Sequence, residues 1–301
     1  MSRIAGKRVA LLLGGNGSER EVSLATGEAM REALLRLGAE LRVVDTASPA
    51  LFELGQWRPE LAVLAVHGAA GEDGRLQGYL DILGIPYTGS GVLGSALAMD
   101  KLRSKQIFAS NGLATPRWVE STTISGMEPP FMPCVAKAAN EGSSVGVHIV
   151  RSREDWAQSA ELDGRSILIE EFIEGREFTV AVMDGRLLGV LEITTASGRY
   201  DYEAKYQRSD NVYTVLSPEH PRDGEMVRRM GELGLKGYAA LGLRGVARVD
   251  LLLDERGPWL LEANTLPGMT ASSLVPKIAA SIGWDFDRLV EEIALAARFD
   301  G

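Results

Sequence analysis

Short apolar runs and one amphipathic segment alternate over residues 7–68, and few folds accept such an order. Residues 7–15, KRVALLLGG, have a β pattern that stops at a glycine pair, and residues 18–38 follow with helical periodicity. Further strands are expected at 40–45 and 61–68, the second nearly all apolar, as in a sheet that is covered on both faces. The alternation predicts a parallel α/β sheet in the first part of the chain.

Local residues suggest where the first helix and the next unit begin. Ser18 and Glu21 match a capping box that would start the helix, and Gly38 would end it. Residues 84–91, GIPYTGSG, are rich in turn formers and indicate a boundary. Residues 93–112 then read as a helix that opens a second unit.

The rest of the chain is richer in strands. A polar stretch without periodicity, 197–212, has the length of a functional lid. We divide the chain into an α/β domain at 1–95, a central lobe at 96–184 and a C-terminal lobe at 185–301, and so expect α/β and α+β units together. Strands are expected at 134–138, 145–150, 166–173, 176–183 and 186–195.

Composition narrows the classes of protein that remain. The 301 residues are 45% hydrophobic and 24% charged, as in an ordinary soluble globular protein, and no run approaches a membrane span. The N-terminus lacks the apolar core of a signal peptide. The single cysteine, Cys134, fits a reducing cytoplasm and is expected to be buried. The net charge of -9 argues against a nucleic-acid partner.

Residues 247–269, ARVDLLLDERGPWLLEANTLPGM, read as a β-hairpin with polar residues at unusual places. A three-residue loop ending at Gly257 would set Asp254 opposite Pro258 and Leu252 opposite Leu260. The same register would continue to the open end of the hairpin.

At that open end, Asp250 would face Glu262 and Arg248 would face Asn264, all on one face of the hairpin. Opposed carboxylates destabilise a strand pair unless a cation lies between them. Carboxylate and amide oxygens suit Mg²⁺, so one interpretation is a metal site. The other is a solvated outer face on which Arg248 neutralises its neighbours.

A phosphate-binding loop is the partner that such a metal site would require. Residues 137–147, KAANEGSSVGV, place Lys137 at a strand end before small residues whose N–H groups suit an anion, although an ordinary loop has the same composition. Lys101 and Lys205 would be plain surface lysines without further information. Three carboxylates among apolar residues need partners, which a nucleoside would provide: Glu170, Glu171 and Glu177.

Taken together, these segments closely resemble D-alanine–D-alanine ligases of the ATP-grasp superfamily, over almost the whole chain. The resemblance implies a three-domain ATP-grasp fold with an N-terminal Rossmann-like domain, and a cytoplasmic homodimer. It implies ligation of two D-alanines through an acyl phosphate for peptidoglycan precursors, with ATP and Mg²⁺ or Mn²⁺. The motifs are HGAAGEDGRLQG (67–78), YTGSG and SALAMDKLRSK (87–105), NEGSSVGV (140–147), EGREFTV (174–180), YDYEAKY (200–206), RVD (248–250) and LEANTLPGMTASSLVP (261–276).

The resemblance also implies roles for individual residues. Two Mg²⁺ ions would be held by Asp250, Glu262 and Asn264. ATP would be contacted by Lys101, Lys137, Glu170, Glu171, Ile173, Glu177 and Lys205. The first D-alanine would lie against Glu19, in a network with Ser143 and Tyr206, and near His67, while the second would bind Ser273 and Leu274. Arg248 and the N–H of Gly268 would stabilise the oxyanion.

Some positions depart from the family, and other functions stay open. Gly17 stands where serine is usual, and Ala138 where proline is usual. Tyr206 favours an amine acceptor, because relatives that accept D-lactate tend to have phenylalanine there. The alternatives are an ATP-grasp ligase with another carboxylate–amine pair, or a nucleotide-binding module without chemistry.

Overall fold

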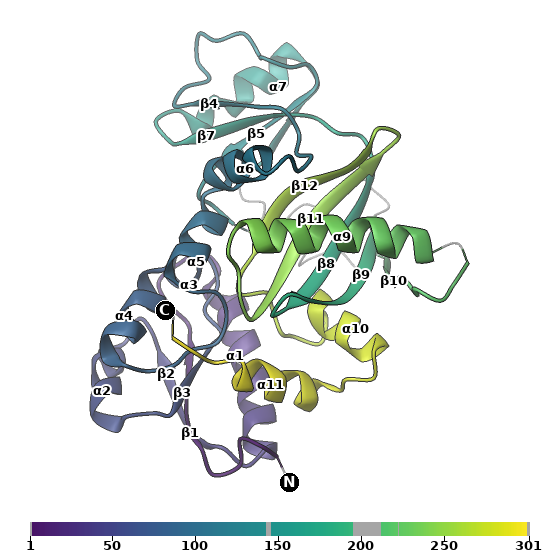
Figure 1. The fold of residues 1–301 in the computed structure, drawn as a ribbon. Coiled ribbons are helices and arrows are strands. Elements are labelled where there is room, and N and C mark those ends of the chain that lie inside the picture. The colour runs from purple at the N-terminus through teal and green to yellow at the C-terminus, as the bar shows by residue number, and fades with distance from the viewer. Residues whose placement is uncertain (1, 143–145, 195–211, 222, 300–301) are drawn as a thin grey trace.

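The computed structural model describes residues 2–142, 146–194, 212–221 and 223–299. Three sheets form the framework, and Figure 1 shows them as three successive regions of the molecule. The functional pocket described below takes residues from all three regions.

The N-terminal region has the parallel sheet that the sequence predicts. Its strand order is β2-β1-β3, and both neighbours run parallel to the central strand. Apolar side chains of α1, among them Met30 and Leu34, pack on Val9 and Leu11 of β1 in one buried cluster. The elements are β1 (Arg8–Leu13), α1 (Arg20–Arg36), β2 (Glu40–Asp45), a 3₁₀ helix (Pro49–Glu53), α2 (Leu54–Trp57), β3 (Leu61–Leu64), α3 (Ala69–Glu72), α4 (Arg75–Leu83) and α5 (Val92–Met99).

The second sheet is antiparallel, with strand order β4-β7-β5-β6. A small apolar cluster forms under it, and it includes Cys134, which is fully buried as predicted. The elements are α6 (Lys101–Ser110), β4 (Trp118–Ser121), β5 (Cys134–Ala138), β6 (His148–Val150), α7 (Arg153–Gln158), a 3₁₀ helix (Ser159–Leu162) and β7 (Ile167–Glu171).

The third sheet has helices on both faces, with strand order β10-β9-β8-β11-β12. Side chains alternate along β8, so Val180 and Val182 pack on the side of α9, whereas Ala181 and Met183 pack on the side of α10. Figure 1 shows α9 lying across the sheet. The elements are β8 (Arg176–Met183), β9 (Arg186–Thr194), β10 (Val212–Val215), α9 (Gly224–Ala240), β11 (Val246–Asp254), β12 (Gly257–Asn264), α10 (Leu274–Ser281) and α11 (Phe286–Leu295).

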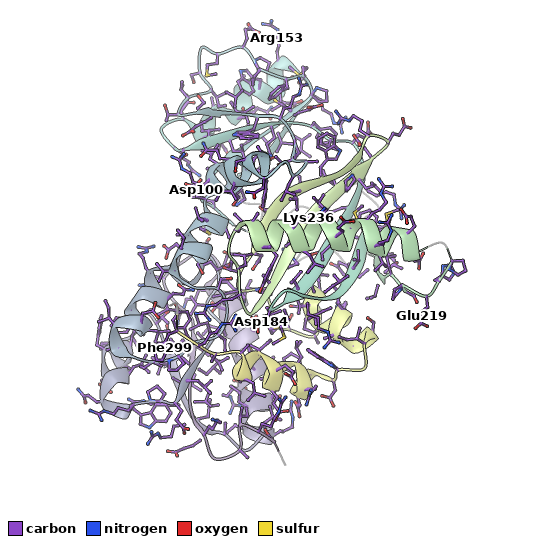
Figure 2. All side chains as sticks on the ribbon, in the orientation of Figure 1. Asp100, Arg153, Asp184, Glu219, Lys236 and Phe299 are labelled. Atoms are coloured by element: carbon purple, nitrogen blue, oxygen red, sulfur yellow. The ribbon has the colours of Figure 1, made fainter. Side chains whose placement is uncertain are left out.

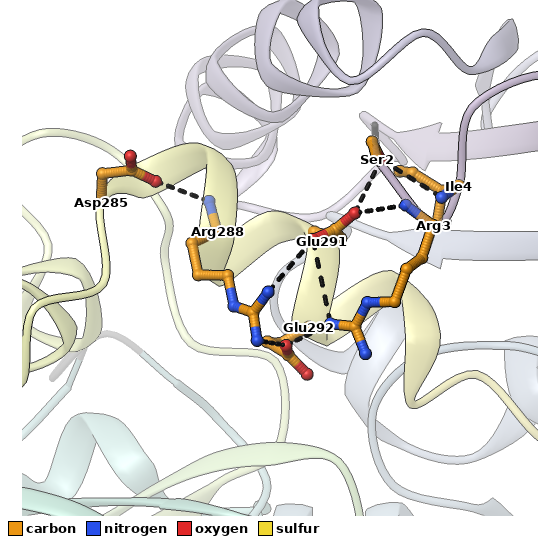
Figure 3. Close-up of polar contacts among 7 residues, drawn as sticks. All are labelled: Ser2, Arg3, Ile4, Asp285, Arg288, Glu291 and Glu292. Carbon is orange, nitrogen blue, oxygen red and sulfur yellow. Dashed lines mark hydrogen bonds and ion pairs between the residues drawn. The ribbon is translucent and has the colours of Figure 1, made fainter.

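The end of the chain returns to the N-terminal region. Helix α11 packs on α1, and Figure 3 shows its carboxylates meeting the first residues of the chain. Glu291 Oε1 accepts hydrogen bonds from Ser2 Oγ and from the Arg3 N–H, both at 2.7 Å. Arg3 and Arg288 both form ion pairs with Glu292. The C-terminal helix therefore fixes the N-terminal sheet to the third one.

Two local predictions are wrong. Helix α1 begins after Glu19, which makes no side-chain cap, so the capping box of Ser18 and Glu21 does not form. The helix predicted over 93–112 is two helices, because Asp100 leaves the helical conformation and caps the second one by accepting from the N–H groups of Leu102 and Arg103. Figure 2 shows Asp100 at this junction. After this cap in mid-segment, α6 begins with Lys101 at the pocket.

The segmentation of the later chain was only partly foreseen. The boundaries predicted at residues 95 and 184 stay predictions, although β8, which ends at Met183, pairs with β9 and β11 of the third sheet. The apolar pattern also missed β4 and did not assign α9. Among the described residues, no helix has the length and apolar character to cross a bilayer.

Candidate active site

A pocket of about 580 Å³ lies where α1, α6 and the open end of the hairpin meet. Its walls combine the loop before α3, the start of α6 and the segment between β12 and α10. Nine of the residues that the resemblance implicates line it: Glu19, His67, Lys101, Arg248, Glu262, Asn264, Gly268, Ser273 and Leu274.

The open end of the hairpin has the predicted register. Arg248 pairs with Asn264, and Asp250 with Glu262. Arg248 grips the Asp250 carboxylate with two hydrogen bonds, Nε–Oδ1 and Nη2–Oδ2, both 2.9 Å. The Thr179 hydroxyl of β8 donates to the same carboxylate at 2.7 Å. The four polar residues therefore form an ordered cluster, as the alternation predicted, and not a loose outer face.

The tip of the hairpin differs from the prediction. Leu252 lies opposite Trp259, and Leu253 opposite Pro258. The register shifts after Asp250, because β12 contributes one extra residue, Leu261, as in a β-bulge. The loop has two residues instead of the predicted three, and the extra residue in β12 compensates for it. The predicted register is therefore wrong between the bulge and the loop, and correct at the open end.

Lys101 connects the second sheet to the hairpin. Its ammonium donates to the Glu141 carbonyl at 2.7 Å and lies 3.5 Å from Glu262 Oε2. The Lys101 N–H also donates to the Ala139 carbonyl. On sequence grounds alone, Lys101 is expected to be a surface lysine, but it is buried against the wall of the pocket.

Glu170 is shared between two lysines. Its Oε2 lies 2.6 Å from Lys137 Nζ, and its Oε1 lies 2.6 Å from Lys105 Nζ. Burial raises the pKa of Glu170, but the charges of Lys137 and Lys105 outweigh it and hold the pKa below its usual range. Sequence reasoning missed Lys105, although it lies four residues after Lys101, on the same face of α6.

The other residues predicted to face a nucleotide, and described by the structure, are Glu171, Ile173 and Glu177. The Glu171 carboxylate points to Arg117 and Arg256, at 2.7 and 2.9 Å. Ile173 is buried, and Glu177 lies opposite Leu252 in the ladder between β8 and β11. The carboxylate of Glu171 is therefore paired with two arginines outside the pocket. Contact between its backbone and adenine stays a prediction.

His67 links three segments of the chain at one wall of the pocket. Its Nδ1 lies 2.9 Å from the Leu266 carbonyl, which only accepts, so Nδ1 carries the proton and Nε2 accepts from the Thr26 hydroxyl at 2.9 Å. The Thr26 oxygen in turn accepts from the Met269 N–H at 3.3 Å. Burial lowers the pKa of His67 to about 4, so the ring is neutral at pH 7. The network fixes the loop that follows β12.

Two carboxylates approach Gly68 from different helices. Glu72 Oε1 accepts from the Gly68 N–H at 2.9 Å, and a Cβ on Gly68 would lie 2.4 Å from Glu19 Oε2. Burial, and then the charge of Glu19, raise the pKa of Glu72 to about 8. Sequence reasoning missed Glu72, although it lies inside the motif at 67–78. This corner of the pocket favours a positively charged group.

The far wall carries the residues predicted for the second amino acid. The Ser273 hydroxyl accepts from the Thr270 N–H at 3.0 Å, at the start of α10, which Leu274 begins. A Cβ on Gly268 would lie 3.0 Å from Ser273 Oγ, so the backbone approaches closely there. Three predicted residues, Ser143, Lys205 and Tyr206, lie outside the described residues, as does the lid predicted at 197–212 except for its last residue.

The donor set at the hairpin suits a divalent cation. Asp250, Glu262 and Asn264 offer two carboxylates and an amide, the hard oxygen ligands that Mg²⁺ prefers. Arg248 and Lys101 neutralise the carboxylates here, as the opposed charges require. Within the described part of the chain, no cluster of three or more His, Cys, Asp or Glu residues is placed to hold a metal. The predicted site therefore depends on the Asn264 oxygen as a ligand.

Comparison with known proteins finds relatives over nearly the whole chain. Residues 113–294 match the family model described as the D-ala D-ala ligase C-terminus. The chain is 44% identical to the D-alanine–D-alanine ligase of Anaeromyxobacter sp. (strain K), with 97% of each chain covered. It is 40% identical to that of Syntrophotalea carbinolica, with 97% of this chain and 96% of the relative covered.

The chain belongs to the D-alanine–D-alanine ligase family. A crystal structure of such a ligase from Bacillus anthracis, complexed with ATP, is similar with a TM-score of 0.81 and 34% identity, over 97% of this chain and 96% of that one. The resemblance and the fold class inferred from the sequence are thereby confirmed. Family membership by itself assigns no role to an individual residue of the pocket.

Proposed function

We propose that this protein is an ATP-dependent ligase that joins two D-alanines into D-alanyl-D-alanine for peptidoglycan precursors. The observation that carries the proposal is the division of one pocket into two kinds of wall. The paired carboxylates Glu19 and Glu72 lie on one side, Lys101 of α6 and Glu262 of the hairpin lie on the other, and Arg248 lies between them. A zwitterionic amino acid and an anionic nucleotide fit such a pocket together.

Substrate binding follows from charge. Glu19 attracts the ammonium of the first D-alanine, and Ser273 with the N–H of Leu274, at the start of α10, receives the carboxylate of the second. Neutral His67 holds the loop between them without repelling the ammonium. Lys101 and Lys137 contact the phosphates of ATP, while Glu170, Glu171, Ile173 and Glu177 line the nucleoside.

The reaction then needs two transfers. The carboxylate of the first D-alanine attacks the γ-phosphorus of ATP, giving an acyl phosphate and ADP. The neutral amine of the second attacks the acyl carbon, the C–O bond to the phosphate breaks, and phosphate leaves with one amine proton as the peptide bond forms. Arg248 and the N–H of Gly268 stabilise the oxyanion at this carbon, a role for which a fixed cation and a donor are suited. Asp250, which accepts a hydrogen bond from Thr179, holds Arg248 in place.

A metal ion completes the charge balance in this proposal. Asp250, Glu262 and Asn264 would hold Mg²⁺, or Mn²⁺, as two ions. Bound there, the metal would offset negative charge on the transferred phosphoryl group. Exclusion of water from the acyl phosphate falls to the lid at 197–212, with Ser143, Lys205 and Tyr206 as its contacts to the site. We further propose a homodimer that works in the cytoplasm.

The test is a measurement of phosphate release from Mg-ATP with D-alanine, with L-alanine, or with D-alanine plus D-lactate. We expect release to depend on D-alanine, with one dipeptide formed for each phosphate. Tyr206 predicts that D-alanine outcompetes D-lactate as acceptor at neutral pH. Binding of ATP without stimulation by any D-amino acid would contradict the proposed substrates, and would favour a different carboxylate–amine pair.

A further inference from the structure

Lys105 is a fully buried lysine for which the proposed reaction has no direct use. Its side chain is 0% exposed. The ammonium lies 2.6 Å from Glu170 Oε1, donates to Thr115 Oγ1 at 2.7 Å, and lies 5.3 Å from the centroid of the Trp118 ring. Lysines are almost never fully buried, because an ammonium loses its hydration. Such a group needs a function that offsets this cost.

The three charges around Glu170 do not cancel. One carboxylate lies between two ammonium groups, so the trio of Lys105, Glu170 and Lys137 has a net charge of plus one. Glu170 is 3% exposed and Lys105 is not exposed at all, whereas Lys137 is 12% exposed. The excess charge is therefore presented to a ligand through Lys137.

Strand register explains why the trio is rigid. In the ladder between β5 and β7, Lys137 lies opposite Leu168, and Val135 lies opposite Glu170. Lys137 and Glu170 are thus diagonal neighbours on one face of the sheet, within reach of each other. Lys105 comes from α6 on the other side of the carboxylate, and so binds the oxygen that Lys137 does not.

We propose that Lys105 is a positioning residue for the nucleotide, which neutralises Glu170 so that Lys137 keeps its positive charge for a phosphate. The inference rests on the proposed function, in which Lys137 contacts ATP. Without Lys105, Glu170 and Lys137 would form a closed neutral pair, and a phosphate would have to compete with Glu170 for Lys137. Removal of Lys105 would therefore weaken the binding of ATP and not the binding of D-alanine.

A second contact of Lys105 provides the alternative explanation. Thr115 Oγ1 donates to the Leu260 carbonyl at 2.8 Å, and the Leu260 N–H donates to the Ala114 carbonyl at 2.8 Å. Lys105 therefore also supports the contact between the segment after α6 and β12. If this support were its only role, removal of the Thr115 hydroxyl would have the same effect as removal of Lys105.

The experiment is a double-mutant cycle on ATP binding. Lys105→Met keeps the unbranched apolar part of the side chain and removes the ammonium, and we expect the KM and Kd for ATP to rise on the order of tenfold, as for loss of a charge-assisted contact. The KM for D-alanine and the kcat at saturating ATP should change by less than about twofold. In a Glu170→Gln background, where the carboxylate charge that Lys105 neutralises is gone, Lys105→Met should change the Kd for ATP by less than about twofold.

Thr115→Val is the matched control, because it removes the Thr115 hydroxyl and leaves the ion pair between Lys105 and Glu170. We expect its KM for ATP to stay within about twofold of the original. The inference is overturned if Lys105→Met leaves ATP binding unchanged, if Thr115→Val reproduces its effect, or if the effect persists in the Glu170→Gln background. Absence of dipeptide synthesis by the unmodified protein would instead overturn the proposed function.

Discussion

Two regions of the molecule, the proposed nucleotide wall around Glu170 and the proposed substrate wall around Glu72, treat buried carboxylates in opposite ways. Glu170 has two lysines against it, Lys105 and Lys137, and its pKa is held low. Glu72 has Glu19 and, with a smaller effect, Arg248 as charged neighbours, and its pKa is raised to about 8, chiefly by burial. A wall with excess positive charge suits an anion, and a wall with crowded carboxylates suits an ammonium. In the proposed function, one fold thus provides adjacent sites for two ligands of opposite charge.

Arg248 lies between the two walls, so its loss should affect turnover more than either binding step. We expect Arg248→Gln to lower kcat on the order of 100-fold, as for removal of an oxyanion donor. The KM for ATP and the KM for D-alanine should change far less. Phosphate release under saturation with each substrate measures the split.

Arg228→Gln is a suitable control for that substitution. Arg228 is exposed on α9 and paired with Glu225, far from the pocket, so its loss should leave kcat within about twofold of the original. A large rise of one KM with unchanged kcat in Arg248→Gln would place Arg248 on a single wall, and would contradict its role between them.

The raised pKa of Glu72 predicts that stability depends on pH. Between its ordinary value of 4.5 and about 8, the folded protein holds a proton that the unfolded chain has released. The free energy of unfolding therefore falls as pH rises through this window. Relative to Glu72→Gln, the protein should lose about 2 kcal/mol between about pH 5.5 and 7.5, measured by urea denaturation.

His67 supplies an internal contrast for these curves. Its pKa is lowered to about 4, so the unfolded chain binds a proton that the folded protein excludes below about pH 6.5, and stability falls toward acid. Glu72→Gln should leave this acid limb in place. Parallel curves for the two proteins from pH 5.5 to 7.5 would show that Glu72 is ionised in the folded state, and would remove the contrast between the walls.

A substitution at Gly68 would directly change the packing around Glu19 on the proposed substrate wall. Its φ of +72° favours glycine, and an added Cβ would lie 2.4 Å from Glu19 Oε2. We expect Gly68→Ala to raise the KM for D-alanine about tenfold through displacement of Glu19, with little change in the KM for ATP. Backbone strain should also cost on the order of 1 kcal/mol of stability.

Gly6→Ala separates the two effects of that substitution. Gly6 also has positive φ, +75°, but a Cβ there meets nothing within 4 Å. It should lose stability without changing either KM. Equal rises of both KM values in Gly68→Ala would show that the two walls are not independent.

Much of the site was accessible from sequence because it depends on local periodicity. The period of two along the hairpin placed Arg248, Asp250, Glu262 and Asn264 on one face, and the register at that end is as predicted. The bulge at Leu261 was not predictable, because it depends on how β12 meets its neighbours. The capping box of Ser18 failed for a similar reason, since competing backbone contacts decide which residue caps a helix.

Residues whose role depends on burial were missed even inside recognised motifs. Lys101 and Lys105 lie one helical turn apart, and nothing local indicates that one faces the pocket while the other lies sealed against Glu170. Glu72 likewise follows His67 in one motif, and burial in the folded protein, together with the approach of Glu19 from the start of α1, raises its pKa. Such effects arise between segments that are distant in sequence.

By itself, the sequence determined the parallel N-terminal sheet, the polar face of the hairpin and the family, because each follows from residue order within a short segment. The tertiary structure alone decided which charges are shared, buried or crowded. Electrostatic energies depend on distance and on access to water, and both are set only when the three sheets come together around one pocket.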